Sequence, residues 1–170
     1  HYAYPLTLNK LQRLLHIIHT LDELESISAS KLARIMDIKE QTAHTVKAIY
    51  TAVHQSDLVK QYEVAGIEVI VYTSDLYPEE LLQLCNPPSV LYVKGDSQLL
   101  TASKKIACIG SWVASSYSVE AFKQIIPPLV ENQCIIVSGL AKGADTLAHR
   151  AAIHYGGKTI AVLGHGFQTI

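Results

Sequence analysis

The stretch CIIVSGLAKGADTLAHRAA, residues 134–152, passes from an apolar run through a glycine-containing loop into an amphipathic segment. A short apolar run that ends in Ser-Gly is typical of a buried strand of a parallel sheet. The residues that follow Gly143 place small and apolar side chains at helical spacing, with an aspartate in their first turn. The stretch therefore predicts a buried strand, a tight turn and a helix, which together form one βα unit.

The same pattern is repeated on both sides of this unit. The run KIACIG (105–110) predicts a strand and residues 116–132 a helix, while KTIAVLG (158–164) predicts a third strand. Successive βα units call for parallel strands joined by crossover helices. We therefore expect an α/β fold with a Rossmann-like parallel sheet whose apolar runs are buried.

The residues before this region follow a different pattern. Residues 1–60 have apolar side chains at helical spacing, and two amphipathic segments that meet near Asp37–Lys39 suggest a helix-turn-helix. Few cations lie on those segments, which favours a small helical bundle without a role in DNA binding. The runs IEVIVY (67–72) and VLYV (90–93) predict strands. We expect a small helical domain over residues 1–60, followed by a Rossmann-like domain over residues 61–170.

Composition and charge are those of an ordinary globular protein with two unlike parts. The chain has 170 residues, 49% of them hydrophobic, and a net charge of −1. Residues 1–100 contain 8 Lys and Arg against 12 Asp and Glu, whereas residues 101–170 contain 6 against 3. This difference in sign indicates two units, of which the second tolerates phosphate groups.

Membrane insertion and disulfide chemistry are not expected. No apolar run approaches the roughly 20 residues that cross a bilayer, and the beginning of the sequence lacks the pattern of a signal peptide. The cysteines, Cys85, Cys108 and Cys134, are odd in number and far apart, which favours buried reduced thiols over disulfides or a metal site. We expect a cytoplasmic protein without a bound metal or cofactor.

Glycine follows each of the three predicted strands, in the sequences Gly-Ser, Ser-Gly and Gly-His-Gly. In an open parallel sheet, ligands bind beyond the carboxyl ends of the strands, so the three turns should share one edge. The helix that begins near Gly143 presents amides and a positive dipole end, and Lys142 adds a charge beside it, which suits an anion such as phosphate. Alternatively, the glycines only allow tight turns. The expected anion-binding residues are Gly110, Ser111, Ser138, Gly139, Lys142, Gly143, Gly164, His165 and Gly166, and Trp112 lies beside them on the same predicted edge.

Common nucleotide-binding and hydrolase motifs are absent from these turns. The first turn, in IGSWVASS (109–116), lacks G-x-G-x-x-G, and no G-x-x-x-x-G-K-[ST] occurs. Ser138, Asp145 and His149 could be imagined as a hydrolytic triad, but no G-x-S-x-G turn presents the serine. We interpret Asp145 as a helix cap that bonds backbone amides, and His149 as a brace between neighbouring loops that is also able to touch a ligand.

Two pairs of ring-bearing side chains remain. Trp112 and Tyr117 follow the first turn and are compatible with core packing and equally with stacking on the bases of a single strand. His16 and His19 lie on the first predicted helix, and without further ligands at metal-binding spacing we interpret both as solvated. The sequence therefore predicts no metal site and leaves the role of the aromatic pair open.

Beyond these patterns, the sequence resembles a known family. SGLAKGADTLAHRAAIHYGGKTIAVLGHGF (138–167) is similar to the signature of the DNA-processing protein A family (DprA, also called Smf), and GIEVIVYTSDLYPEELLQLCNPPSVLYVKGD (66–96) is similar to the region upstream of it. The resemblance implies a DprA-type Rossmann-like domain that binds single-stranded DNA in a positively charged pocket. It further implies a dimeric, non-enzymatic protein of natural transformation (competence) and DNA recombination, which protects incoming single strands and loads the recombinase RecA.

The match to the family is incomplete at two places. In the family the first turn usually reads G-S-R or G-A-R, with an arginine that pairs with phosphate, whereas this chain has Trp112. An indole cannot form that bidentate, charge-assisted pair, although it can stack on a base. The sequence also stops at Ile170, where the family continues, so we expect a fragment that lacks the carboxyl-terminal part of the domain and leaves a sheet edge open.

Two other functions stay open. The phosphoribohydrolases that resemble lysine decarboxylases also bind phosphate at glycine-rich loops, but they carry P-G-G-x-G-T and a catalytic glutamate, and GGKTIA (156–161) matches neither. The other alternative is a non-catalytic interaction module whose glycines are structural. Binding of single-stranded DNA that depends on Lys142 would distinguish a DNA-binding protein from the phosphoribohydrolase and from the interaction module.

Overall fold

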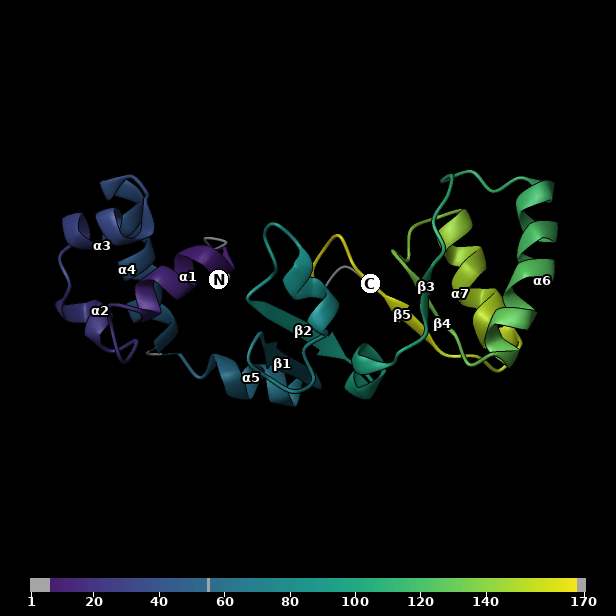
Figure 1. Ribbon diagram of the computed structural model, residues 1–170, viewed down its shortest axis with the longest axis horizontal. Helices are drawn as coiled ribbons and strands as arrows, with labels where there is room; N and C mark the ends of the chain where they lie inside the picture. The colour runs from purple at the N-terminus through teal and green to yellow at the C-terminus, as the bar shows by residue number, and fades with distance from the viewer. Residues whose placement is uncertain (1–6, 55, 168–170) are drawn as a thin grey trace. The chain divides into compact units, whose positions relative to one another are not determined.

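The computed structural model describes residues 7–54 and 56–167 of a chain that divides into two compact units, His1–Thr101 and Ala102–Ile170 (Figure 1). Each unit has its own helices and its own sheet. Among the described residues, no helix is both long enough and apolar enough to cross a membrane.

Four helices at the start of the first unit enclose an apolar core. They are α1 (Leu8–Leu15), α2 (Glu23–Ser26), α3 (Ala29–Met36) and α4 (Glu40–His54). Leu14, Leu32 and Met36 are almost completely buried in this core, because each amphipathic helix turns its apolar stripe inward. The Ser28 hydroxyl oxygen accepts a hydrogen bond from the Lys31 amide (3.3 Å) and so caps the start of α3.

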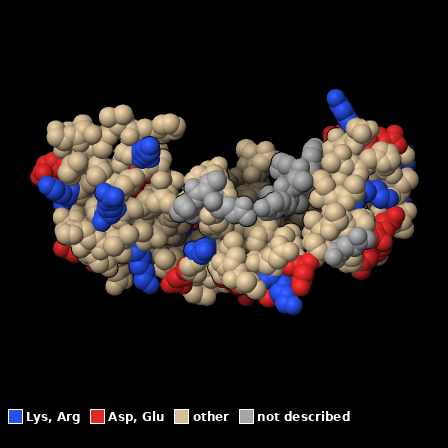
Figure 2. Space-filling view, turned by 180° about the vertical axis from the view of Figure 1, so that it is seen from behind, with Lys and Arg blue, Asp and Glu red and all other residues tan. Residues whose placement is uncertain are grey.

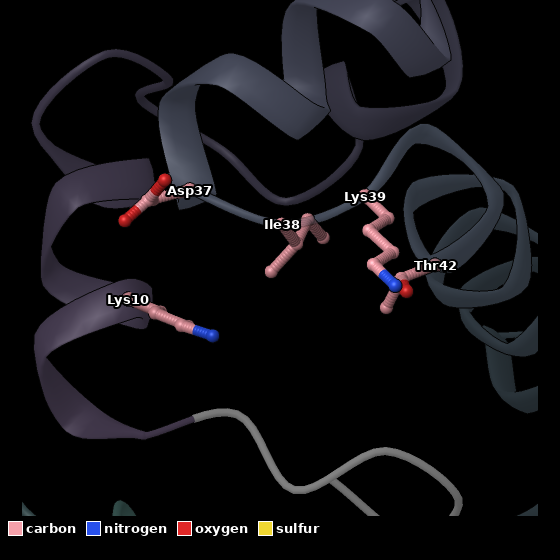
Figure 3. A pocket seen from close by; sticks show the side chains of 5 residues that line it. All are labelled: Lys10, Asp37, Ile38, Lys39 and Thr42. Atoms are coloured by element: carbon pink, nitrogen blue, oxygen red, sulfur yellow. The ribbon is translucent and has the colours of Figure 1, made fainter.

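A short turn joins α3 to α4. Asp37 adopts a left-handed conformation (φ 52°) after α3, and the Ile38 amide donates to the Ala33 carbonyl (3.0 Å), which closes the helix. The two helices predicted to meet near Asp37–Lys39 are therefore confirmed. Figure 3 shows a shallow hollow beside this turn, lined by Lys10, Asp37, Ile38, Lys39 and Thr42. The hollow is lined by two lysines and one aspartate, so its charge is mixed and points to no particular ligand.

A two-stranded antiparallel sheet completes the first unit. Helix α5 (Leu58–Val64) leads into β1 (Ile67–Val71), and β1 pairs with β2 (Val90–Lys94). The 3-10 helix η1 (Glu79–Gln83) lies between the two strands, and η2 (Ser97–Thr101) follows β2. Tyr77 is 4% exposed and its hydroxyl donates to the Pro88 carbonyl (2.6 Å), which ties together the two ends of the connection. Burial raises the pKa of Tyr77 above its ordinary value.

The division of the chain into two compact units falls at a different place from the predicted domain boundary. Helix α5 packs on β1, so a boundary after residue 60 falls inside the first unit. The contacts within the chain instead divide it after Thr101. This division rests on contacts alone, and the assignment of residues 1–60 and 61–170 to separate domains stays a prediction.

The second unit contains the predicted parallel sheet. Its strands are β3 (Lys105–Ala107), β4 (Ile135–Ser138) and β5 (Thr159–Ala161), in the order β3-β4-β5, and its helices are α6 (Ser116–Glu131) and α7 (Ala144–His154). Both helices lie on the same side of the sheet (Figure 1). Ile136 of β4 is fully buried against Ile126 of α6 and against Ala148 and Ala152 of α7. The α/β fold class predicted from the sequence is confirmed.

Two of the apolar runs leave the sheet before they end. β3 and β5 stop at Ala107 and Ala161, where their pairing with β4 ends. The apolar residues beyond them, Ile109 and Val162, are 81% and 63% exposed. The expectation that each whole run is buried was therefore wrong, because the length of an apolar run does not say where the neighbouring strand stops.

The three cysteines have different surroundings. Cys85 is exposed in the connection between β1 and β2, whereas Cys108 and Cys134 are half-buried beside the parallel sheet, and all three are free thiols. Burial raises the pKa of the Cys108 thiol. The expectation of buried thiols was therefore wrong for Cys85.

Candidate nucleic-acid interface

The turns after the three parallel strands lie at one edge of the second unit. Because β3, β4 and β5 are parallel neighbours, their carboxyl ends point the same way, and Figure 1 shows the loops after β3 and β4 rising to the amino ends of α6 and α7. The Ala144 amide donates to the Ser111 carbonyl (3.0 Å), which joins the turn after β3 to the start of α7. The Val162 amide donates to the Ser138 carbonyl (2.8 Å), which joins the turn after β5 to the end of β4.

Two glycines make the contact between the first two turns possible. A Cβ atom on Gly110 would lie 2.7 Å from the Cβ of Ala144. A Cβ atom on Gly143 would collide with the carbonyl groups of Ser111 and Trp112, and Gly143 also has a positive φ of 84° that favours glycine. These two glycines are therefore required by the packing of one turn on the other, whatever ligand the edge takes.

The carboxylate of Asp145 occupies the loop that follows β4. Its Oδ2 atom accepts hydrogen bonds from the amides of Gly139 (3.1 Å) and Ala141 (3.4 Å). No side chain caps the amino end of α7 at Gly143. Asp145 bonds the loop that precedes the helix. The interpretation as a helix cap had assumed that Asp145 bonds the first turn of its own helix. The Gly139 amide is therefore engaged by a protein carboxylate and does not face a ligand.

Ser138 and His149 are held inside the unit. Ser138 is 4% exposed and its hydroxyl donates to the Cys108 carbonyl (2.6 Å). His149 is 5% exposed, and its Nδ1 atom is hydrogen-bonded to the Thr159 hydroxyl (2.6 Å), which in turn donates to the Ile136 carbonyl (2.7 Å). His149 thus joins α7 to β5. The hydroxyl of Ser138 donates to a carbonyl and not to the imidazole, so these side chains do not form a hydrolytic triad.

The charge of His149 is controlled by its burial. Desolvation lowers the pKa of the ring, while the nearby Asp145 carboxylate and the backbone of Ser138 act in the opposite direction and favour protonation. The lowered pKa means that burial outweighs both partners. His149 is therefore neutral at physiological pH and adds no positive charge to the edge of the sheet.

Lys142 and Ser111 are exposed polar residues at this edge. Lys142 lies directly before the turn glycine of α7, its side chain is exposed, and it forms no salt bridge with any residue in the described ranges. The Ser111 hydroxyl oxygen accepts from the Val113 amide (3.2 Å), which leaves its hydrogen able to donate. Figure 2 shows several groups of Lys and Arg atoms on one face of this unit, on the left of that view, in keeping with its excess of positive residues.

The remaining predicted residues differ in their exposure. Trp112 and Tyr117 are 79% and 80% exposed, so core packing, one of the two roles that the sequence left open, does not apply to them. Gly164 and Gly166 have open space where a Cβ atom would lie, and the Nδ1 atom of His165 is hydrogen-bonded to the Gly166 carbonyl (3.0 Å). The turn after β5 is therefore an open surface turn, in contrast to the tight contact between the other two.

Metal chemistry finds no support at this edge. Within residues 7–54 and 56–167, no group of three or more His, Cys, Asp and Glu side chains is arranged to hold a metal ion. The half-buried carboxylate of Asp145 is used by loop amides, and the ring of His149 by a hydroxyl. The exposed groups that this edge offers a ligand include the ammonium group of Lys142, the hydroxyl of Ser111 and the rings of Trp112 and Tyr117.

Sequence reasoning missed the internal partners of these residues. The contact of Asp145 with the loop after β4 spans six residues, and that of Ser138 with Cys108 spans 30. An acidic residue just after a glycine-rich turn is compatible with both a helix cap and a loop anchor, so no signal in the sequence separates the two. The exposed aliphatic residues Ile109 and Val162 were missed because they extend runs that read as strands.

Known proteins place these observations in a family. Residues 68–170 match the family model of DNA recombination-mediator protein A. The chain belongs to this family. The resemblance read from the two motif-bearing stretches of sequence is thereby confirmed, and the matched region includes all three turns at the edge of the parallel sheet.

Individual relatives agree with this assignment. The chain is 37% identical over 109 residues to DNA processing protein DprA of Bacillus subtilis, 46% over 94 residues to DprA of Streptococcus pneumoniae, and 38% over 97 residues to protein Smf of Escherichia coli. These matches cover 64%, 55% and 57% of this chain, but only 37%, 33% and 26% of the three relatives. The chain thus spans well under half the length of the curated relatives it matches.

A solved structure extends the likeness to the amino-terminal helices. The X-ray structure of DNA processing protein A from Streptococcus pneumoniae matches 97% of this chain with a TM-score of 0.73 and 30% sequence identity. The chain covers 56% of that structure. The fold of this chain is therefore that of a recombination-mediator protein over both of its units.

Proposed function

We propose that the edge of the parallel sheet in the second unit binds the backbone of single-stranded DNA, with Lys142 as the cation that contacts phosphate. The observation that carries the proposal is the contact between the turn after β3 and the amino end of α7, through Ser111 and Ala144, with exposed Lys142 directly before that helix. An exposed ammonium group at the positive end of a helix dipole attracts phosphate oxygens.

The proposed contact set is narrower than the set of glycines and serines at the strand ends. Lys142, Ser111 and the open turn from Gly164 to Gly166 are accessible to a nucleic-acid strand. Ser138 and Gly139 support the site from within, because their donors are used by a carbonyl and a carboxylate of the protein. Gly110 and Gly143 hold the two turns together.

The wider role that we propose follows from membership of the recombination-mediator family. In that role the whole protein binds single-stranded DNA during natural transformation, protects it and delivers it to the recombinase RecA. It acts as a cytoplasmic homodimer and performs no catalysis. Two features support a binding protein over a hydrolase: the hydroxyl of Ser138 is bonded to a carbonyl, and the imidazole of His149 is bonded to Thr159.

A binding titration with a matched lysine control tests the proposal. Fluorescently labelled oligo-dT is titrated with the chain, with Lys142→Ala and with Lys104→Ala, at several salt concentrations. Lys104 is a suitable control because it precedes β3, at the opposite edge of the sheet, where its ammonium group donates to the Asn132 carbonyl (3.1 Å). We expect Lys142→Ala to weaken binding about fivefold, as for one partly exposed ion pair of about 1 kcal/mol.

The outcomes separate the candidate functions. Binding that falls with salt and with Lys142→Ala, but not with Lys104→Ala, supports the proposal. Equal loss in both variants would indicate nonspecific attraction to the unit and would contradict a site at this edge. Absence of binding to oligo-dT by the unmodified chain, together with release of ribose phosphate from a nucleoside monophosphate, would favour the phosphoribohydrolase alternative.

A further inference from the structure

Two aromatic rings stand out of the same exposed segment of the second unit. Trp112 and Tyr117 are 79% and 80% exposed, in a segment between β3 and the first turn of α6 in which every residue from Ile109 to Tyr117 is exposed. Large aromatic side chains are normally withdrawn from water, because each buries a large apolar area when packed. Two of them exposed on one short segment indicate a surface that is covered when a ligand binds.

The position of the segment shows what lies next to these rings. The Ser111 carbonyl accepts from the Ala144 amide, and the carbonyl of Trp112 lies so close to Gly143 that a Cβ atom there would collide with it. The backbone that carries the indole is therefore packed against the turn that carries Lys142. A single-stranded DNA bound through a phosphate at Lys142 would therefore have this aromatic segment beside it.

The spacing of the two rings suits one continuous strand. They are five positions apart in the sequence, so their Cα atoms are at most about 18 Å apart, which corresponds to a few nucleotides. The segment around them contains serines and small residues but no charged side chain from Ile109 to Tyr117. It can therefore contribute to binding through the flat faces of bases and not through phosphate charge.

We propose that Trp112 and Tyr117 form a stacking platform for the bases of a single strand whose backbone contacts Lys142. The inference rests on the proposed function and adds the part of the ligand that is recognised: unpaired bases. Stacking needs only the π-face that every base has, so the platform is tolerant of sequence. It contributes affinity that salt does not screen, in contrast to the contact at Lys142.

The single tryptophan of the chain allows a direct test. Trp112 is the only tryptophan in the sequence, so emission excited selectively from tryptophan reports on this segment alone. The chain is titrated with unlabelled oligo-dT and, in parallel, with an abasic oligonucleotide of the same length, which has the phosphates but no bases. We expect oligo-dT to quench the emission and to bind at least about fivefold more tightly than the abasic strand.

Variants distinguish the rings from their surroundings. Trp112→Ala and Tyr117→Ala are each expected to weaken binding of oligo-dT about fivefold while leaving the abasic strand unaffected, and Trp112→Phe and Tyr117→Phe to retain most of the affinity. Val113→Ala is the matched control, because Val113 is 82% exposed in the same segment but has no ring. Trp112→Arg is expected to bind oligo-dT more tightly than Trp112→Ala, and its binding should depend more steeply on salt than that of the unmodified chain.

The results separate failure of this inference from failure of the proposed function. If oligo-dT binds with the expected dependence on Lys142 but Trp112→Ala and the abasic strand change nothing, the edge binds DNA and the platform is refuted. If neither strand binds, the proposed function itself is refuted. If emission changes with protein concentration alone and Val113→Ala abolishes that change, the exposed segment associates with a second copy of the chain, which also overturns the platform.

Discussion

The amide of Ala144 and the carbonyl of Ser111, 3.0 Å apart, join two turns that are separated by more than thirty residues of sequence. One turn follows β3 and the other begins α7, so this bond holds together the parts of the edge that carry Trp112 and Lys142. Its geometry depends on a glycine on each side, at positions 110 and 143. The edge is therefore formed where two loops pack together, and a substitution in either loop should alter its geometry.

Substitution of Gly143 should separate the two turns. In Gly143→Ala the added methyl group meets the backbone carbonyls of Ser111 and Trp112, and the positive φ of 84° strains any other residue. We expect a loss of about 3 kcal/mol in the free energy of unfolding, measured by chemical denaturation followed by circular dichroism. Gly164→Ala serves as the control, because open space surrounds that position, and it should change stability by less than about 0.5 kcal/mol. Equal effects of the two substitutions would contradict this packing of the two turns.

The carboxylate of Asp145 should stabilise the fold more than a neutral hydrogen-bond acceptor at the same position would. Asp145→Asn keeps an oxygen that can accept from the amides of Gly139 and Ala141 but removes the charge, and we expect it to cost about 1 kcal/mol of folding stability. Asp145→Ala leaves both amides without this acceptor and should cost about 2–3 kcal/mol. Thermal unfolding of the three proteins checks the order. An alanine variant as stable as the unmodified protein would show that the two bonds are dispensable.

Folding stability should depend on pH through His149. Burial lowers the pKa of this ring below the ordinary value of 6.5, so the unfolded chain binds a proton more readily than the folded one. The free energy of unfolding should therefore be unaffected by this group well above pH 6.5 and decrease as the pH falls below it. Chemical denaturation between about pH 8 and pH 5 measures the slope.

A pair of histidine variants assigns that slope. His149→Gln retains a side chain that can bond Thr159 and should remove part of the decrease at low pH. His154→Gln, at the exposed carboxyl end of the same helix, controls for the loss of one imidazole. A slope that is the same in His149→Gln as in the unmodified chain would assign the pH dependence to other groups.

The hydroxyl of Tyr77 should contribute to the first unit alone. Tyr77→Phe removes the donor to the Pro88 carbonyl (2.6 Å) in a buried position, and we expect a loss of about 1–2 kcal/mol in folding stability. Tyr117→Phe, which changes an exposed ring, is the control and should be neutral. Hydrogen exchange would place the loss in residues of the first unit. Loss of protection around β4 and α7 in Tyr77→Phe would contradict the description of two separate units.

Much of the second unit could be predicted from the sequence because its signals are local. The helix expected over residues 116–132 is α6, Ser116–Glu131, and the helix expected near Gly143 begins at Ala144. The strand ends were less predictable, since β3 and its register with β4 end at Ala107, before the apolar run ends. The apolar residue Ile109 gives no sign in the sequence that it lies outside the sheet.

The candidate site was predictable in its location but not in its internal bonds. Parallel strand order alone brings the three turns to one edge, which the spacing of the glycines indicated. That the Ser138 hydroxyl donates to Cys108, and that Asp145 accepts from the loop amides, depends on how distant backbone atoms meet after folding. The exposure of Trp112 likewise follows from the path of a loop, which residue type does not determine.

The carboxylate of Asp145, which is bonded to the loop after β4, should affect the rate at which single-stranded DNA associates with this edge. Asp145 lies three residues from Lys142, and the field of two opposite charges so placed decays with distance more steeply than that of a lone cation. This pair of charges therefore adds little to the long-range attraction of a polyanion, which depends instead on the excess of positive residues over the whole unit. Differences in affinity among oligonucleotides should then appear as differences in residence time on the protein.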